Sequence, residues 1–174
     1  IFIIFFSICI SFLVNSTNAN ENFLNPKLGE AKLPESSLFN HEKVEININD
    51  FKSKNIILNF WASWCAPCLE ELPSLSSLAK EVKKNDIIII LVNLDKSKKT
   101  NLTKFLNGVD INYVNLLYDP EAKWAKKLNI SGLPTTLLIN KVQNKYYTHL
   151  GPLNWDDPIV VKSLLKHFVK QNNF

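Results

Sequence analysis

One stretch of the sequence constrains the fold more than any other: residues 56–73, which read IILNFWASWCAPCLEELP. Its first part, residues 56–61, is a mostly apolar run with the length and the β-branched and aromatic composition of a strand. Cys65 and Cys68 follow after a short turn. Leucines then recur at a helical spacing, at Leu69, Leu72, Leu75 and Leu78. The stretch therefore predicts a strand that delivers two cysteines to the start of a helix.

The predicted helix start has consequences for cysteine chemistry. Pro67 fits the first turn, because the N–H that proline lacks has no intrahelical partner there. Cys65 would lie at the helix N-terminus, where free N–H groups and the helix dipole favour a negative charge. Such sites lower a cysteine pKa from about 8.5 to about 3.5–7.5, and the thiolate is the reactive form. Cys68, one turn further in, is placed to close a disulfide with Cys65 and release a bound partner.

Residues 60–68, FWASWCAPC, resemble the active site of the thioredoxin superfamily. With Glu71 and Pro73 after the second cysteine, the motif is similar to that of the TlpA/ResA-like thiol-disulfide oxidoreductases. The resemblance implies an α/β protein with a thioredoxin fold, in which helices flank a central mixed sheet, with an N-terminal β-hairpin and a central insertion. Pro73 is expected to kink or restart the helix.

A second resemblance lies in residues 129–139, NISGLPTTLLI, which are similar to the cis-proline loop of the superfamily and the strand after it. It implies a cis bond between Leu133 and Pro134, a costly and therefore deliberate feature. It also implies that the backbone of Leu133 faces the cysteines and pairs with an extended substrate. Residues 151–155, GPLNW, resemble TlpA more than ResA.

The sequence departs from thioredoxin at Asn59. Cytoplasmic thioredoxins carry a buried aspartate at this place, which assists proton transfer to the second cysteine. Because an asparagine cannot exchange a proton at physiological pH, we expect Asn59 to be a hydrogen-bonded buried amide. Glu71 is the better acid, since the glutamate at this position tunes the thiols in the resembling family. The alternative for Glu71 is a solvated helix residue, as expected for Glu70.

These considerations give two sets of site residues. The expected catalytic residues are Cys65, Cys68, Glu71 and Pro134. The expected substrate-binding residues are Trp64, Ala66, Pro67 and Leu133.

Periodicity predicts further elements on both sides of the cysteine motif. Residues 36–39 and 44–48 are expected to form the hairpin, with His41 in its solvent-exposed turn. Residues 87–92 form a continuous apolar run that is typical of a central parallel strand. Residues 95–100 are lysine-rich and are expected to be a solvated loop. Leu102 to Leu106 suggest a short helix ended by Gly108.

The second half completes the predicted sheet. Residues 111–117 are expected to be a short edge strand, and a helix is expected to open at Asp119-Pro120. Residues 145–149 should pair with residues 135–139 as a hairpin. The last helix is expected to begin at Pro158, capped by Asp156 or Asp157. Its predicted buried residues are Val161, Leu164, Leu165 and Phe168.

The N-terminal part divides into two segments before the domain. Residues 1–14 are nearly all apolar, and residues 1–19 are expected to be a signal peptide or a membrane anchor with its start missing. Fourteen apolar residues fall short of the ~20 that span a bilayer, although missing residues could supply the rest. Residues 20–35 are interpreted as a linker and residues 36–172 as the thioredoxin-like domain. Either N-terminal reading places the domain in the periplasm or on the outer face of the cytoplasmic membrane.

Composition argues against several other classes of protein. The net charge is +4 and all 20 basic residues are lysine, so no bidentate guanidinium is available for nucleic acid. No motif implies a metal, nucleotide or flavin. A zinc site would need two more ligands, and the distant candidates are His41, His149 and His167. A peroxiredoxin would need a threonine where Ala62 stands.

The resemblance implies a protein-disulfide reductase. Ala66 and Pro67 carry no group that would strongly stabilise a thiolate, which favours a reductant over a disulfide oxidant or isomerase. Family members reduce apocytochrome c or copper-site cysteines of respiratory oxidase and its assembly factors, and the expected donor is a membrane protein that carries electrons on thiols. A second hypothesis is a copper-binding chaperone of the same fold, although those proteins place three residues between their cysteines.

Overall fold

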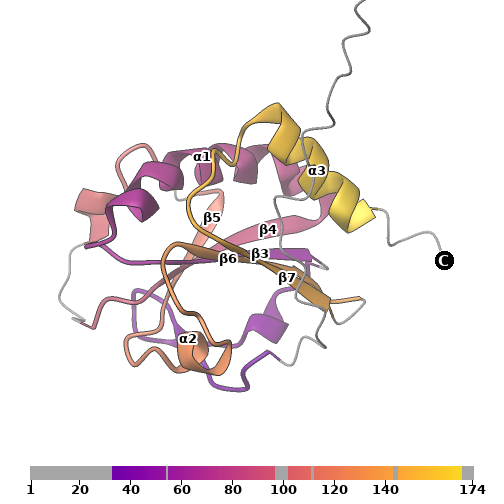
Figure 1. Ribbon diagram of the computed structural model, residues 1–174. Helices are drawn as coiled ribbons and strands as arrows, with labels where there is room; N and C mark the ends of the chain where they lie inside the picture. The colour runs from indigo at the N-terminus through magenta and orange to yellow at the C-terminus, as the bar shows by residue number, and fades with distance from the viewer. Residues whose placement is uncertain (1–32, 54, 97–101, 111, 143–144, 170–174) are drawn as a thin grey trace, which may run out of the picture.

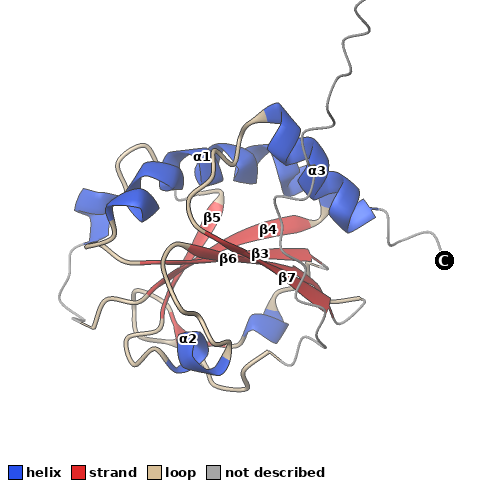
Figure 2. Ribbon diagram, in the orientation of Figure 1, coloured by secondary structure: helices blue, strands red, loops and turns tan. Residues whose placement is uncertain are grey.

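Figure 1 shows the computed structural model, which describes residues 33–53, 55–96, 102–110, 112–142 and 145–169. One seven-stranded mixed sheet has the order β2-β1-β5-β4-β3-β6-β7. Its strands are β1 Leu38–Phe39, β2 Glu45–Ile46, β3 Asn55–Trp61, β4 Ile87–Asn93, β5 Val114–Tyr118, β6 Thr135–Asn140 and β7 Lys145–Leu150. The α-helices are α1 Ala66–Val82, α2 Lys123–Lys127 and α3 Pro158–Val169 (Figure 2). The 3-10 segments are η1 Ile48–Asp50, η2 Lys83–Asn85 and η3 Leu102–Phe105.

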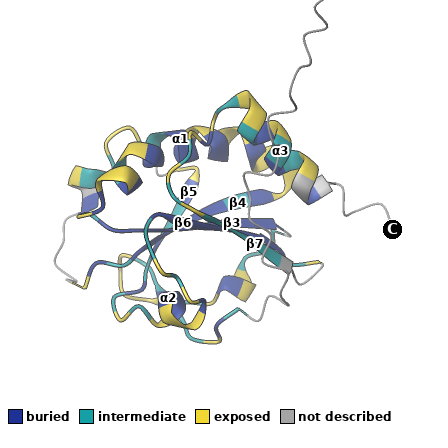
Figure 3. Ribbon diagram, in the orientation of Figure 1, coloured by how far each residue is buried: buried dark blue, intermediate teal, exposed yellow. Residues whose placement is uncertain are grey.

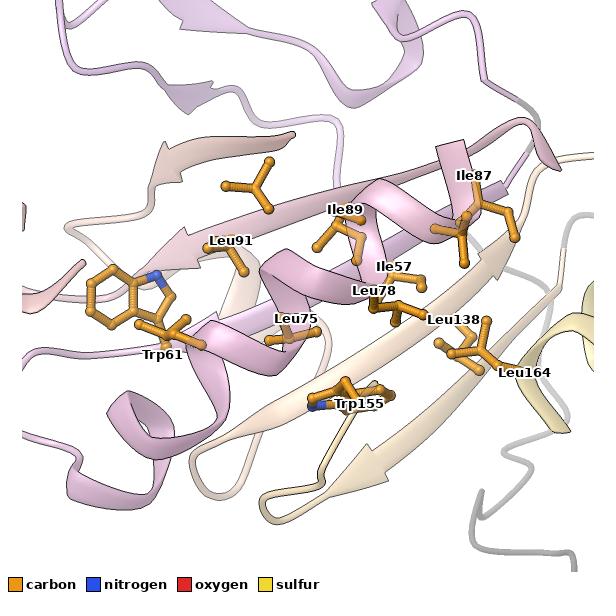
Figure 4. Close-up of a cluster of buried hydrophobic side chains, with 14 of the residues drawn as sticks. Ile57, Trp61, Leu75, Leu78, Ile87, Ile89, Leu91, Leu138, Trp155 and Leu164 are labelled. Carbon is orange, nitrogen blue, oxygen red and sulfur yellow. The ribbon is translucent and has the colours of Figure 1, made fainter. Parts of the chain in front are cut away.

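The elements form three layers. Helices α1 and α3 cover one face of the sheet, and α2 covers the other (Figure 1). Each face has its own hydrophobic core, because alternate residues of a strand point to opposite faces. On the α1 and α3 face, Trp61 and Trp155 pack with leucines and isoleucines of the helices and strands (Figure 4). On the α2 face, Trp124 packs with Phe60 and Leu137. This architecture confirms the predicted thioredoxin-type α/β fold.

Strands β3 and β4 form the centre of the sheet. They are parallel and in register from Asn55↔Ile87 to Trp61↔Asn93, and β6 lies antiparallel on the other side of β3. Every residue of β3 is buried (Figure 3). Fully burying one large aliphatic or aromatic side chain contributes about 1.5–3 kcal/mol. The continuous apolar runs therefore predicted the two central strands correctly.

The N-terminal hairpin is present, and it places β5 inside the sheet rather than at its edge. Strands β1 and β2 pair antiparallel across the turn at His41, which is exposed as expected. Phe39 in turn pairs with Tyr118, so β5 lies between β1 and β4. The prediction of an edge strand at residues 111–117 was therefore wrong. The hairpin is distant in the sequence, so the pattern of β5 alone could not reveal that its outer edge is covered.

Two helix boundaries also differ from the prediction. Helix α1 continues from Ala66 to Val82 with Pro73 inside it, so the helix does not restart there, and the alternative of a kink at Pro73 stays a prediction. Helix α2 begins at Lys123 rather than at Pro120. The carboxylate of Asp119 accepts hydrogen bonds from the N–H groups of residues 123–125, at 2.8, 2.9 and 3.2 Å, and so fixes the later start.

The last helix and the last hairpin agree with the sequence. Helix α3 begins at Pro158, and Asp157 accepts a hydrogen bond of 2.8 Å from the N–H of Ile159. Strand β7 pairs antiparallel with β6, as the predicted hairpin requires, with Thr135 opposite Leu150 and Asn140 opposite Lys145. The expected short helix after Leu102 is the 3-10 segment η3, and Gly108 lies beyond it with φ +78°. The predicted signal peptide or anchor lies outside the described residues, and most of the linker does too.

Candidate active site

The two cysteines form a disulfide at the beginning of α1, with their sulfur atoms 2.04 Å apart. Cys65 is the N-cap residue, and its N–H donates to the carbonyl of Ala62 at 3.1 Å, which closes the turn after β3. The exposed fraction is 6% for Cys65 and 0% for Cys68. Of the two cysteines, only Cys65 therefore retains any exposed surface, whereas Cys68 is fully buried in the core.

Helix α1 starts where the sequence predicted, directly after Cys65. Ala66 and Pro67 are the first two helical residues, and both are exposed. The side chain of Cys65 makes no capping hydrogen bond in the disulfide form. The N–H groups of a first helical turn lack intrahelical acceptors, and together with the helix dipole they favour an anion such as a thiolate at Cys65.

A buried carboxylate fixes the turn that carries the cysteines. Asp95 accepts hydrogen bonds from the N–H of Ser63, at 3.1 and 3.3 Å, and from the side-chain amide of Asn93 at 3.3 Å. Asp95 is 7% exposed, so the prediction of a solvated loop was wrong at its first residue. Lys96 is exposed, and residues 97–100 lie outside the described residues. The sequence did contain a signal for this contact, because Asp95 follows β4, and the carboxyl end of β4 lies beside that of β3.

Glu71 is buried on α1, one turn after Cys68, with 3% of its surface exposed. Its Oε1 accepts from the side-chain amide of Asn59 at 2.7 Å. Its Oε2 accepts from the indole N–H of Trp155 at 2.8 Å and from the backbone N–H of Leu153 at 3.0 Å. Desolvation by burial raises the pKa of Glu71, although these three donors act in the opposite direction. The alternative of a solvated helix residue is excluded.

The position of Glu71 also relates it to the second cysteine. Cys68 and Glu71 are three residues apart on α1 and both are buried. Residues at this spacing are neighbours on one helix face, with about 5–6 Å between their Cβ atoms. Glu71 thus lies one helical turn after Cys68 on the same buried face of α1, whereas neighbouring Glu70 is exposed as predicted.

Asn59 occupies the expected buried position on β3, with 0% exposure. Its Nδ2 donates to Glu71 and, at 2.9 Å, to Oγ1 of Thr136. Its Oδ1 has no hydrogen-bond partner within the described part of the chain, so the amide is only half satisfied. Sequence reasoning found Asn59 and Glu71 but missed their joint network with Thr136 and Trp155.

The cis-proline loop lies at the same end of the sheet as the cysteines. The Leu133–Pro134 peptide bond is cis, as predicted. Thr135 pairs with Phe60, so the loop before Thr135 lies beyond the carboxyl end of β3, from which the cysteine turn also emerges. The carbonyl of Pro134 accepts from the N–H of Gly151 at 2.9 Å. Leu133 is half-buried between the two cores.

The surface around the cysteines is apolar. Trp64, directly before Cys65, is 73% exposed, and the side chains of Ala66 and Pro67 are exposed beside it. Single exposed apolar residues need no explanation, but an exposed tryptophan next to a reactive cysteine offers a contact surface for a partner. The predicted substrate-binding residues thus come from the start of α1 and from the cis-proline loop.

Two of the three histidines considered as metal ligands have described side chains, His41 and His149. His41 is in the exposed hairpin turn, and His149 packs edge-to-face on Trp155 with ring centroids 5.9 Å apart. The side chain of His167 lies outside the described residues. Within the described ranges, no group of three or more His, Cys, Asp or Glu residues is arranged to hold a metal ion.

A family model described as Redoxin matches residues 28–164. The chain belongs to this family. Within the Redoxin family it is a ResA/TlpA-like protein of the thioredoxin superfamily, in agreement with the sequence motifs. The narrower preference for TlpA remains a prediction.

Curated relatives carry the name thiol-disulfide oxidoreductase ResA. The protein of Bacillus subtilis is 35% identical over 95 residues, which are 55% of this chain and 52% of the relative. That of Geobacillus thermodenitrificans is 30% identical over 123 residues, 69% of this chain and 70% of the relative. The match thus spans about half the length of the B. subtilis relative.

Solved structures share the fold. The exposed lipoprotein thioredoxin Etrx1 of Streptococcus pneumoniae matches 75% of this chain and 97% of its own, with a TM-score of 0.59 and 27% identity. StoA of Bacillus subtilis matches 78% of this chain and 97% of its own, with a TM-score of 0.57 and 24% identity.

Proposed function

We propose that this Redoxin-family protein reduces disulfides of protein substrates by thiol-disulfide exchange. The observation that carries the proposal is the cysteine pair at the start of α1, in which Cys65 reaches the surface and Cys68 does not. The names of the ResA relatives support the same reaction type.

The proposed reaction begins with both cysteines reduced. The Cys65 thiolate attacks one sulfur of the substrate disulfide, so that a mixed disulfide forms and the other substrate sulfur leaves as a thiolate. Cys68 then loses its proton and attacks the sulfur of Cys65, which releases the second substrate thiol. The substrate gains two electrons and two protons, and the protein ends in the Cys65–Cys68 disulfide form.

The remaining site residues have assigned roles in this proposal. Trp64, Ala66 and Pro67 provide the exposed surface on which the substrate rests. The backbone of Leu133, held by the cis bond to Pro134, pairs with the extended substrate segment. Glu71 sets the proton affinity of the thiol pair from below Cys68, because a buried charge nearby disfavours a second negative charge.

The setting of the reaction is also part of the proposal. We place the domain outside the cytoplasm, on the strength of the apolar residues 1–14. In the described part of the chain, no helix is long and apolar enough to cross a membrane. The proposed substrates are disulfides of apocytochrome c or of respiratory oxidase assembly factors. A membrane thiol donor would return the Cys65–Cys68 disulfide to its reduced form.

The experiment that tests the reaction compares two single substitutions. We expect Cys65→Ser to abolish insulin disulfide reduction, since the attacking sulfur is gone. Cys68→Ser should instead accumulate a mixed disulfide with the substrate, visible as an added mass that dithiothreitol removes. Undiminished reduction by Cys65→Ser would refute the assignment. The partner trapped by Cys68→Ser in its own cell envelope would identify the substrate.

A further inference from the structure

A cavity of about 180 Å³ lies close to the cis-proline loop, on the α2 face of the sheet. Residues 128–131 form one wall, and Thr135, Thr148 and Leu150 of β6 and β7 form the other. Alternation along β6 and β7 places these three side chains on the same face as Leu137 and Tyr146, which belong to the core on the α2 side. The wall contains hydroxyl, amide and aliphatic groups but no charged side chain.

The strand register places the cavity at the active-site end of the sheet. Phe60 of β3 pairs with Thr135, and Thr135 pairs with Leu150. Neighbouring strands are about 4.8 Å apart, so Leu150 lies roughly 10 Å along the sheet from the strand that leads to Cys65. An extended peptide advances about 3.3 Å per residue and would cover this distance in about three residues.

The rim of the cavity touches the cis-proline loop itself. Leu150 lines the cavity and is itself 59% exposed, so it lies at the cavity rim. A Cβ added to Gly132 would come within 3.3 Å of Leu150 Cδ1, so the two residues are already in close contact. Gly132 directly precedes Leu133, the residue proposed to pair with substrate. The cavity therefore continues the surface along which the substrate would run.

Size and polarity determine what the cavity accepts. An apolar cavity of about 150 Å³ holds a benzene molecule, so this one suits a leucine, isoleucine or phenylalanine side chain. A charged side chain would lose its hydration without finding a charged partner. Building on the proposed function, we propose that the cavity binds an apolar side chain of the protein substrate, within a few residues of the cysteine attacked by Cys65.

Peptide disulfides test this subsite. Symmetrical disulfide dimers of nonapeptides with a central cysteine would carry Leu, Ser, Asp or Lys at each other position in turn. The oxidation rate of the reduced protein would be measured against peptide concentration, with bis(2-hydroxyethyl) disulfide as reference. We expect Leu at a position within a few residues of the cysteine, on one side only, to raise kcat/KM by at least about tenfold over Asp or Lys, mainly through KM.

Two matched variants locate the effect. Leu150→Lys places a charge at the cavity rim, whereas Ile159→Lys makes the same kind of change at a residue of α3 that is 73% exposed. The preference for Leu should fall severalfold in Leu150→Lys and persist in Ile159→Lys. Leu150→Ser serves the same purpose if the lysine variant does not fold, as judged by circular dichroism.

The outcomes separate this proposal from the one on which it rests. The subsite would be refuted if kcat/KM of the wild-type protein did not depend on the position of Leu in the peptide. It would also be refuted if the Leu150 variants kept the wild-type dependence. In both cases the proposed disulfide reduction itself would remain. Failure of the wild-type protein to react with any peptide or with the reference disulfide would instead refute the proposed function.

Discussion

At the scale of single residues, Glu71 combines two opposing influences. Burial disfavours the charged form of the Glu71 carboxyl group, whereas hydrogen bonds from Asn59, Leu153 and Trp155 favour that form. Desolvation is the larger influence and raises the pKa of Glu71. A carboxylate in this position therefore changes protonation at a higher pH than a solvated glutamate.

The first prediction concerns the thiols. Glu71→Gln should lower the apparent thiol pKa of the Cys65 and Cys68 pair, because the like charge that opposes thiolate formation is removed. Iodoacetamide alkylation should become severalfold faster on the acid side of its pH profile. Glu70→Gln is the matched control, since Glu70 is exposed and should leave the profile unchanged. Superimposed profiles for wild type and Glu71→Gln would show that Glu71 does not tune the thiols.

The second prediction concerns stability against pH. Because the pKa of Glu71 is raised in the folded state, the folded protein binds this proton more tightly than the unfolded chain. The resulting stabilisation is fully present below the unfolded pKa and is lost as the pH rises through the folded pKa. The free energy of unfolding of wild type minus that of Glu71→Gln should therefore fall as the pH rises above 4.5.

Urea unfolding of the oxidised proteins between pH 4 and pH 9 would measure this difference. The Glu70→Gln variant again serves as control, because it removes the same side-chain charge from an exposed position of α1. A difference for Glu71→Gln that is constant with pH, or that rises with pH, would contradict the assigned direction.

At the scale of elements, Glu71 joins α1 to the segment that leads into α3. Its Oε2 binds the N–H of Leu153 and the indole of Trp155, while Ser74, one turn further on, accepts from the N–H of Trp155 at 3.0 Å. Figure 4 shows Trp155 packed beside Leu75 of α1 on this face of the sheet. The two helices are thus connected by polar contacts as well as by the core.

The third prediction tests that connection. Trp155→Phe removes a hydrogen bond to a carboxylate, a type that contributes about 1.5–3 kcal/mol, together with some packing. In a double-mutant cycle with Glu71→Gln, the two losses of unfolding free energy should be non-additive by about 0.5–3 kcal/mol. Urea unfolding at pH 7 supplies all four values.

Trp124→Phe is the control for this cycle. Trp124 is also fully buried, but its indole donates to the carbonyl of Ser36 at 2.6 Å, on the opposite face of the sheet. The losses of unfolding free energy in Trp124→Phe and Glu71→Gln should therefore be additive. Equal coupling for both tryptophans would mean that the cycle reports general loosening of the fold rather than the contact with Glu71.

At the scale of the whole molecule, the fourth prediction concerns the direction of electron flow. Ala66 and Pro67 offer neither a charge nor a side-chain donor, so the thiolate of Cys65 relies on the helix N-terminus, an effect of about 0.3–2 kcal/mol. The reduced form is then only moderately stabilised. Equilibration with glutathione mixtures should give a potential nearer thioredoxin's ~−270 mV than DsbA's ~−120 mV. A potential near ~−120 mV would favour the alternative of a disulfide oxidant.

The sequence by itself determined the features that depend on neighbouring residues. The strand of β3, the cysteine turn and the start of α1 follow from a stretch of 18 residues, and the cis-proline loop and its strand from another short one. Local propensity and burial specify such units, because strand, turn and helix start agree with one another. The strand, the cysteine pair and the helix start could therefore be predicted from the residues, whereas the fold class and the cis bond were implied by the resemblance of these short stretches to the thioredoxin superfamily.

Only the tertiary structure decided which distant residues complete the site. Trp155 and Glu71 are 84 positions apart, and Asn59 and Thr136 are 77 apart. Asp95, the covered edge of β5 and the cavity at Leu150 likewise depend on strands that pair across the sheet. A buried polar group is partnered by whatever the fold brings to it, and no local pattern encodes that partner.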